Sequence, residues 1–126
     1  MIISESQQER YHTKISNENT SIYSDVIAAS EGIDECFGPH DLLCSGIASC
    51  LNISTRLILE RMNIPYEKIV VKVDINCDEE IKTKFIYDVE IDGELDELSK
   101  EIVMDKLMES PILKTLTKTI EFEELE

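Results

Sequence analysis

The spacing of hydrophobic and polar positions changes several times along the chain, and the clearest feature is a long uncharged run near its middle. From Leu42 to Thr55 no residue is charged, although Asp, Glu, Lys and Arg make up 31% of the sequence. Gly38-Pro39 precedes this run and Pro65 follows it, and such residues favour the start and the end of a helix. The pattern predicts one largely buried helix of about 24 residues, roughly 36 Å long.

Alternating apolar and polar positions predict a hairpin on either side of this helix. Before it, residues 9–16 and 20–28 are two weak strands joined by a turn at residues 16–19, and residues 29–37 have no periodicity and are expected to form a loop. After it, apolar residues alternate with mostly polar ones from Ile69 to Cys77 and from Ile81 to Ile91. This second hairpin should have one buried and one solvent-facing surface.

The last third of the chain predicts a second helix and a final strand. Apolar residues recur at helical spacing through about Glu109, namely Leu95, Leu98, Ile102 and Leu107. Pro111 ends this helix and allows at most a short one from Ile112 to Thr115. The last strand is expected from the alternating residues Lys118, Ile120 and Phe122.

The predicted order is two strands, a long helix, two strands, a helix and a strand. This is an α+β arrangement in which the long helix covers antiparallel sheets. A length of 126 residues and an apolar fraction of 42% fit one core, so residues 1–126 are expected to form a single domain. The long helix has little charge on any face over four turns, and one small sheet cannot hide that much apolar surface. A homodimer with this helix at the interface is therefore expected.

The charge of the chain excludes several kinds of partner. Twelve basic and 27 acidic residues give a net charge of −15, which repels nucleic-acid phosphates and anionic membranes. A membrane span is not expected either, because the uncharged window is shorter than the ~18 apolar residues that a span needs. The N-terminal segment lacks a basic stretch followed by an apolar core, so a cytoplasmic protein is expected.

Four cysteines are the candidate chemical groups. Cys36, Cys44, Cys50 and Cys77 show no CxxC spacing and only two histidines accompany them, so neither a structural zinc site nor another cofactor is expected. In a cytoplasmic protein these thiols would be reduced. Cys44, Cys50 and Cys77 are expected in the core, where free cysteine is common. Cys36 lies in the predicted loop and is the one candidate for an unconventional resolving thiol.

Several segments together resemble the OsmC/Ohr family of small thiol-dependent peroxidases and their relatives. They are Gly38-Pro39-x-x-Leu42-Leu43, Ile47-Ala48-Ser49-Cys50-Leu51, Thr55-Arg56, Val71-x-Val73 after Ile64-Pro65, and Ser110-Pro111-Ile112-Leu113-Lys114-Thr115-Leu116. The resemblance covers the chain from Gly38 onward. It implies an OsmC-like fold: an intertwined homodimer, with two sheets wrapped around paired central helices and a thiol site at the interface.

The resemblance also implies a site, of which this chain keeps one residue in four. Cys50 corresponds to the reactive thiol of the family, and Ser110 stands where the family has its resolving cysteine. His40 stands where the family has a glutamate, and Asp41 beside it is the only nearby carboxylate. For the arginine that activates the thiolate, the first hairpin offers Lys14 but no arginine closer than Arg10. A cation matters because the thiolate, not the thiol, attacks peroxide.

Two functions of different class follow. The first is a one-cysteine hydroperoxide reductase, in which Cys50 attacks a small apolar hydroperoxide and an external thiol reduces the resulting sulfenic acid, because Ser110 cannot form a disulfide. The second is a family member without peroxidase chemistry, which binds an apolar small molecule in the interface pocket or uses Cys50 as a redox sensor. The residues at positions 110 and 40 favour the second function, and Cys50 favours the first.

Overall fold

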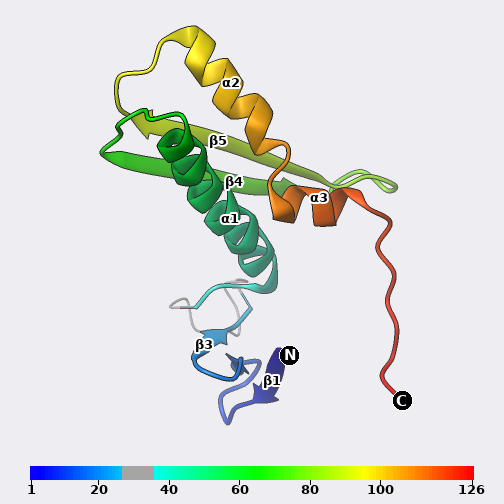
Figure 1. Cartoon of the computed structure of the whole chain (residues 1–126). Helices are drawn as coiled ribbons and strands as arrows, with labels where there is room; N and C mark the ends of the chain where they lie inside the picture. Colours follow the sequence, from blue (N-terminus) through cyan, green and yellow to red (C-terminus); the bar gives the residue numbers. More distant parts are fainter. Residues whose placement is uncertain (27–35) are drawn as a thin grey trace. The chain divides into compact units, whose positions relative to one another are not determined.

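The computed structural model describes residues 1–26 and 36–126, which divide into two compact units, Met1–Leu43 and Cys44–Glu126 (Figure 1). Its antiparallel sheets and long helix confirm the predicted α+β class. The end of the predicted strand 20–28 and most of the predicted loop 29–37 lie outside the described residues. That residues 1–126 form a single domain stays a prediction.

The first unit contains an antiparallel sheet in the order β1-β2-β3, with the bounds Ile3–Ser6, Thr13–Ser16 and Ser21–Ser24. The turn between β2 and β3 is closed by Asn17, whose Oδ1 accepts hydrogen bonds from the backbone N–H groups of Asn19 and Thr20 at 2.8 and 2.9 Å. These two strands confirm the predicted hairpin, with shorter bounds than the pattern indicated.

The sequence pattern does not predict β1, which is short and has no sustained apolar alternation. It forms because its backbone pairs with β2, with Ser4 opposite Ile15. The connecting turn is held by a 3.0 Å hydrogen bond from the Gln7 N–H to the His12 carbonyl, and Tyr11 takes a left-handed backbone with φ of 65°. Backbone pairing, which side-chain patterns reveal poorly, thus decides this element.

The long helix α1 spans Pro39–Arg61, as predicted. Pro39 occupies its first position, and the Asp41 carboxylate accepts a 3.0 Å hydrogen bond from the Gly38 N–H. The helix ends where Asn63 adopts a left-handed backbone with φ of 55°. By length and composition α1 could also cross a membrane, with a mean hydropathy of 1.5, but core helices of soluble proteins pass the same test.

In the second unit, β4 (Lys68–Asn76) and β5 (Lys84–Asp92) form the predicted antiparallel hairpin. Ile69 pairs with Ile91 and Val71 with Val89, so the apolar positions share one face. β4 ends one residue earlier than the alternation suggested and β5 begins three residues later, so Cys77 and Ile81 both lie in the exposed loop between them. The expectation of a buried Cys77 is therefore wrong, because the strand ends before its side chain can reach the core.

Two helices follow, α2 (Glu97–Leu107) and α3 (Pro111–Thr117). The first begins at Asp96, whose side chain accepts a 2.7 Å hydrogen bond from the Ser99 N–H. The expected apolar face of α2 is partly wrong: Leu107 is buried, but Leu98 is 67% exposed and Val103 is buried instead. The short helix α3 contains the predicted residues 112–115.

The predicted last strand is not present in the described chain. Residues 118–126 have no regular secondary structure, and the C-terminal segment extends away from α3 (Figure 1). Ile120 and Phe122 are both exposed. An alternating segment becomes a strand only where an edge is available to pair with it, and no strand of the described residues pairs with this one.

The core of the second unit joins both longer helices to the hairpin. It contains Ile47, Leu51 and Leu59 from α1, Ile69 and Val89 from the strands, and Val103 and Leu107 from α2. Together with the buried Thr55, the α1 residues recur every four positions, so one stripe of the helix faces the core. The neighbouring stripe of α1, which contains Cys50, lies beside this core and is only partly buried.

Candidate functional site

Cys50 lies in the middle of α1 and is half-buried. Its Sγ is 3.9 Å from the Oγ of Ser54, one helical turn further on. Ile58 and Arg61 continue the same side of the helix, because residues three or four positions apart lie above one another. The thiol is therefore the first member of a mixed polar and apolar stripe that runs toward the C-terminal end of α1.

Ser110 lies at the N-cap position of α3 and is only 4% exposed. N-cap serines commonly accept a hydrogen bond from the first turn, yet the Ser110 side chain makes no such bond. Within the described residues its Oγ has no hydrogen-bond partner at all. A buried hydroxyl without a partner costs about 1–3 kcal/mol, so this side chain is suited to receive a polar group from outside.

A cavity of about 390 Å³ lies between the side of α1 that carries Ser54 and the segment that carries Ser110. It is lined by one side of α1 and by the end of α2 with the start of α3, through Ser54, Leu57, Ile58, Arg61, Lys106, Glu109, Ser110 and Pro111. Ser110 thus shares a cavity with Ser54, the residue that contacts Cys50. Its volume lies within the range of small-molecule sites, ~300–1,000 Å³.

Two cations at this cavity, Arg61 and Lys106, were missed by the sequence reasoning. Glu109, the acidic residue in the lining, forms an ion pair with Lys114 at 2.9 Å, whereas neither of the two cations has an ion pair in the described part of the chain. Helical spacing could have indicated Arg61, which follows Ser54 by seven positions on α1. Their charge suits a ligand with an anionic group.

The other two predicted site residues, His40 and Asp41, belong to the first unit. Both lie in the first turn of α1, where the Asp41 carboxylate caps the helix through the Gly38 N–H. His40 is exposed. Capping of α1 therefore explains the presence of a carboxylate at position 41.

Two basic residues that could have served Cys50, Arg10 and Arg56, have other contacts. Arg10 stacks over the ring of Tyr11 at 4.8 Å and donates a 2.9 Å hydrogen bond to its hydroxyl. Lys14 lies in β2 of the first unit. Arg56 points its Nε toward the Asn52 carbonyl at 3.5 Å. In residues 1–26 and 36–126, no group of three histidine, cysteine or acidic side chains is arranged to hold a metal.

Comparison with known proteins gives a consistent fold. A family model described as OsmC-like protein matches residues 32–124. An OsmC-like protein from Mycoplasma pneumoniae has a TM-score of 0.76 at 19% identity, covering 92% of this chain and 85% of that one. A Psychrobacter arcticus protein described as an osmotic stress induced and detoxification response protein has a TM-score of 0.74 at 21% identity, covering 90% and 85%.

A third solved structure carries a more specific description. The organic hydroperoxide resistance protein OhrB of Bacillus subtilis has a TM-score of 0.62 at 16% identity, covering 93% of this chain and 89% of that one. No curated protein matches the sequence significantly. At these identities the structures show a shared fold.

Proposed function

The chain belongs to the OsmC-like protein family, whose model matches residues 32–124, and from this membership we propose that it is a thiol redox protein that reduces organic hydroperoxides at Cys50. The observation that carries the proposal is the shared cavity: Ser110 lines it together with Ser54, whose hydroxyl is 3.9 Å from the Cys50 Sγ. In this proposal the protein acts in the cytoplasm and uses neither a metal nor an organic cofactor.

The chemistry needs one protein thiol and one external thiol. The Cys50 thiolate attacks the terminal oxygen of the hydroperoxide, the O–O bond breaks, and the alkoxide leaves as the alcohol after taking a proton. The sulfenic acid on Cys50 is then attacked by an external thiol, which releases water and forms a mixed disulfide. A second external thiol restores Cys50. Ser110 cannot replace that external thiol, because a hydroxyl forms no disulfide.

The proposal includes an intertwined homodimer. Only 22% of the most apolar window of α1 is buried within the chain. Ile53 and Leu57 on this helix are 48% and 45% exposed, which is unusual for the central helix of a small domain. The exposed C-terminal residues Ile120 and Phe122 would also find a strand edge on a second copy.

A second candidate function rests on the same cavity. Leu57, Ile58 and Pro111 give it apolar walls, while Arg61 and Lys106 add positive charge and Ser110 an unsatisfied hydroxyl. These groups suit a small molecule with an apolar body and an anionic end. In this alternative the protein binds such a molecule, or senses redox state through Cys50, without turning over peroxide.

Labelling with dimedone after brief treatment with cumene hydroperoxide tests the proposal. We expect the sulfenic acid adduct to map mainly to the Cys50 peptide and to disappear in Cys50→Ser, while Cys77→Ser serves as the matched control and keeps the labelling. Equal labelling of all cysteines, or an adduct that survives Cys50→Ser, would contradict the hydroperoxide chemistry. Absence of any adduct on Cys50, with a bound small molecule in native mass spectrometry, would favour the second function.

A further inference from the structure

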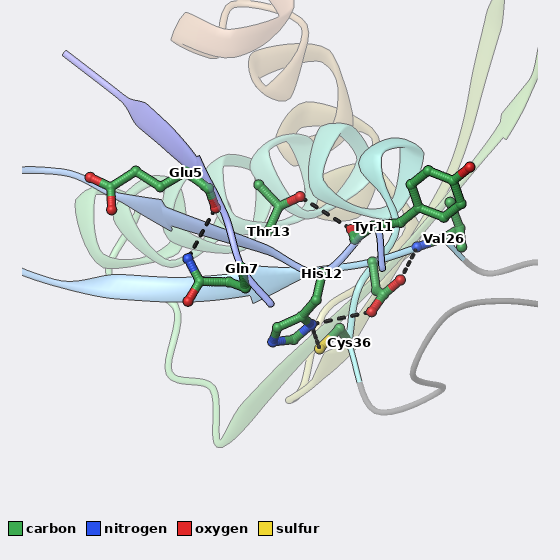
Figure 2. A network of polar contacts seen from close by, with 8 residues as sticks. Glu5, Gln7, Tyr11, His12, Thr13, Val26 and Cys36 are labelled. Atoms are coloured by element: carbon green, nitrogen blue, oxygen red, sulfur yellow. Dashed lines mark hydrogen bonds and ion pairs between the residues drawn. The ribbon is translucent and has the colours of Figure 1, made fainter. Parts of the chain in front are cut away.

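A second thiol lies beside a histidine and a buried aspartate in the first unit (Figure 2). The Cys36 Sγ is 4.0 Å from the Nδ1 of His12, and the same nitrogen is 3.2 Å from the Oδ2 of Asp25. The Asp25 side chain is fully buried and that of His12 is 14% exposed, whereas Cys36 is half-buried. We propose that Cys36 is a second reactive thiol, which forms mixed disulfides with small-molecule disulfides.

Backbone contacts hold the three side chains together from separate parts of the sequence. Asp25 directly follows β3, and its N–H donates a 3.1 Å hydrogen bond to the Phe37 carbonyl. Ser24 and Phe37 form a parallel bridge, so Cys36 is fixed next to the end of β3. The geometry is therefore set by main-chain hydrogen bonds.

The histidine ring is oriented as well. It stacks on Tyr23, with ring centroids 5.0 Å apart and planes within 6°. The Asp25 carboxylate is held by its other oxygen, which accepts a 2.7 Å hydrogen bond from the Val26 N–H. A histidine that is oriented by a carboxylate therefore lies beside the Cys36 thiol, with both partners at the same ring nitrogen, Nδ1.

One ring nitrogen of His12 faces both partners. Nδ1 is 3.2 Å from the buried Oδ2 of Asp25 and 4.0 Å from the Sγ of Cys36. A buried carboxylate needs donors, and an N–H at Nδ1 satisfies this need. The same N–H is within reach of the sulfur once the thiol proton has left to solvent, and the thiolate is the nucleophile.

Space for a reactant lies next to this cluster. A cavity of about 390 Å³ in the first unit is lined by His12 and Asp25, and also by Arg10, Glu9 and Tyr11. Within the described residues, the titratable groups that line this cavity are Glu9, Arg10, Tyr11, His12 and Asp25. The volume admits a small polar molecule.

The reaction is thiol–disulfide exchange. The Cys36 thiolate attacks one sulfur of a disulfide R–S–S–R, a new S–S bond forms to Sγ, and the old S–S bond breaks. The leaving thiolate takes a proton and departs as R–SH, so the small disulfide is the oxidant. This inference does not rest on hydroperoxide reduction at Cys50, because the two thiols belong to different units.

The test uses the full-length protein with a limiting amount of 4,4′-dithiodipyridine, quenched in acid and mapped as non-reduced peptides. Cys77, which is exposed in the loop after β4, is the internal reference. We expect Cys36 to be modified about tenfold faster than Cys77 at neutral pH. The attacking species is the thiolate, and Cys36 has the His12 ring beside its sulfur.

Substitutions distinguish activation of Cys36 by His12 from an effect of solvent exposure alone. His12→Gln should bring the rate at Cys36 to within about twofold of the rate at Cys77, since it removes the activating imidazole. Gln8→Ala, a change in the same cavity wall, should leave the rate at Cys36 as it was. If Cys36 reacts no faster than Cys77, the proposal is wrong. This comparison needs no substitution, so it decides the question even where His12→Gln does not fold.

Discussion

A single buried hydroxyl, that of Ser110, gives the candidate site its most distinctive chemical property. The Ser110 hydroxyl lacks a hydrogen-bond partner in the described residues, so no hydrogen bond offsets the free energy that its desolvation costs. A thiol would tolerate the same burial better, since cysteine behaves as a small hydrophobic residue. The serine therefore makes the free protein less stable than a cysteine would, unless a ligand satisfies its hydroxyl.

Replacement of this serine tests that argument. We expect Ser110→Ala to leave the free energy of unfolding unchanged or to raise it by about 1 kcal/mol, because an unsatisfied buried group is removed. Thr55→Val is the matched control: Thr55 is also buried, but its hydroxyl donates a 2.7 Å hydrogen bond to the Leu51 carbonyl. That change should lower stability by about 1 kcal/mol. Urea denaturation of the ligand-free protein measures both, and a clear loss in Ser110→Ala would mean that its hydroxyl is satisfied.

Individual residues also show what the sequence could and could not predict. The resemblance selected Cys50 and Ser110, of which Ser110 lines the cavity and Cys50 contacts Ser54 in the cavity wall. It gave no reason to select Arg61 or Lys106, because a family motif names only the residues that the family shares. Leu98 was assigned to the core on spacing alone, yet it is exposed, since a helix with several apolar faces buries the one that its neighbours cover.

At the scale of elements, α2 depends on its first residue. Asp96 accepts the Ser99 N–H at 2.7 Å, and this hydrogen bond lowers the pKa of Asp96 below its usual value of 3.8. A carboxyl group whose pKa is lower in the folded state than in the unfolded chain stabilises the fold above the unfolded pKa. That contribution disappears as the pH falls through the folded pKa.

Asp96→Ala should therefore lower the melting temperature at neutral pH by a few degrees, through loss of the cap. The difference from the parent protein should shrink as the pH is lowered from about 5 toward 3, because the carboxyl becomes protonated in both states. Thermal unfolding followed by circular dichroism measures it. Glu97→Gln, a change of charge at the next residue, is the control. An Asp96→Ala effect that is no larger than this control, or that is constant with pH, would show that the cap does not support α2.

The elements differ in how far their sequences determine them. The helix α1 and the β4–β5 hairpin were predicted with nearly correct bounds, because their patterns persist over 23 and nine residues respectively. The strand β1 has four residues and no sustained alternation, so only its pairing with β2 defines it. The segment around Ile120 alternates but has no strand beside it in the described chain, which is why the predicted last strand is absent.

At the scale of the whole molecule, the charge and the apolar surface act in opposite directions. A net charge of −15 keeps copies apart at long range, but salt screens that repulsion beyond about 8–10 Å. The exposed apolar residues of α1 favour association at contact distance, where the hydrophobic effect outweighs screened charge. The balance predicts a dimer that becomes tighter as the salt concentration rises.

Sedimentation equilibrium at micromolar concentration tests this dimer. We expect the parent protein to sediment at twice the chain mass of 14.4 kDa, because a stable interface buries about 1,600 Å² or more and α1 offers the apolar surface for it. Ile53→Asp places a charge on the exposed side of α1 and should shift the equilibrium to the monomer. Leu98→Asp introduces the same charge at an exposed leucine of α2 and should leave the dimer intact. If the parent protein has the mass of a monomer, or if both substitutions dissociate the dimer alike, then α1 does not form the interface. The intertwined architecture would then be wrong as well.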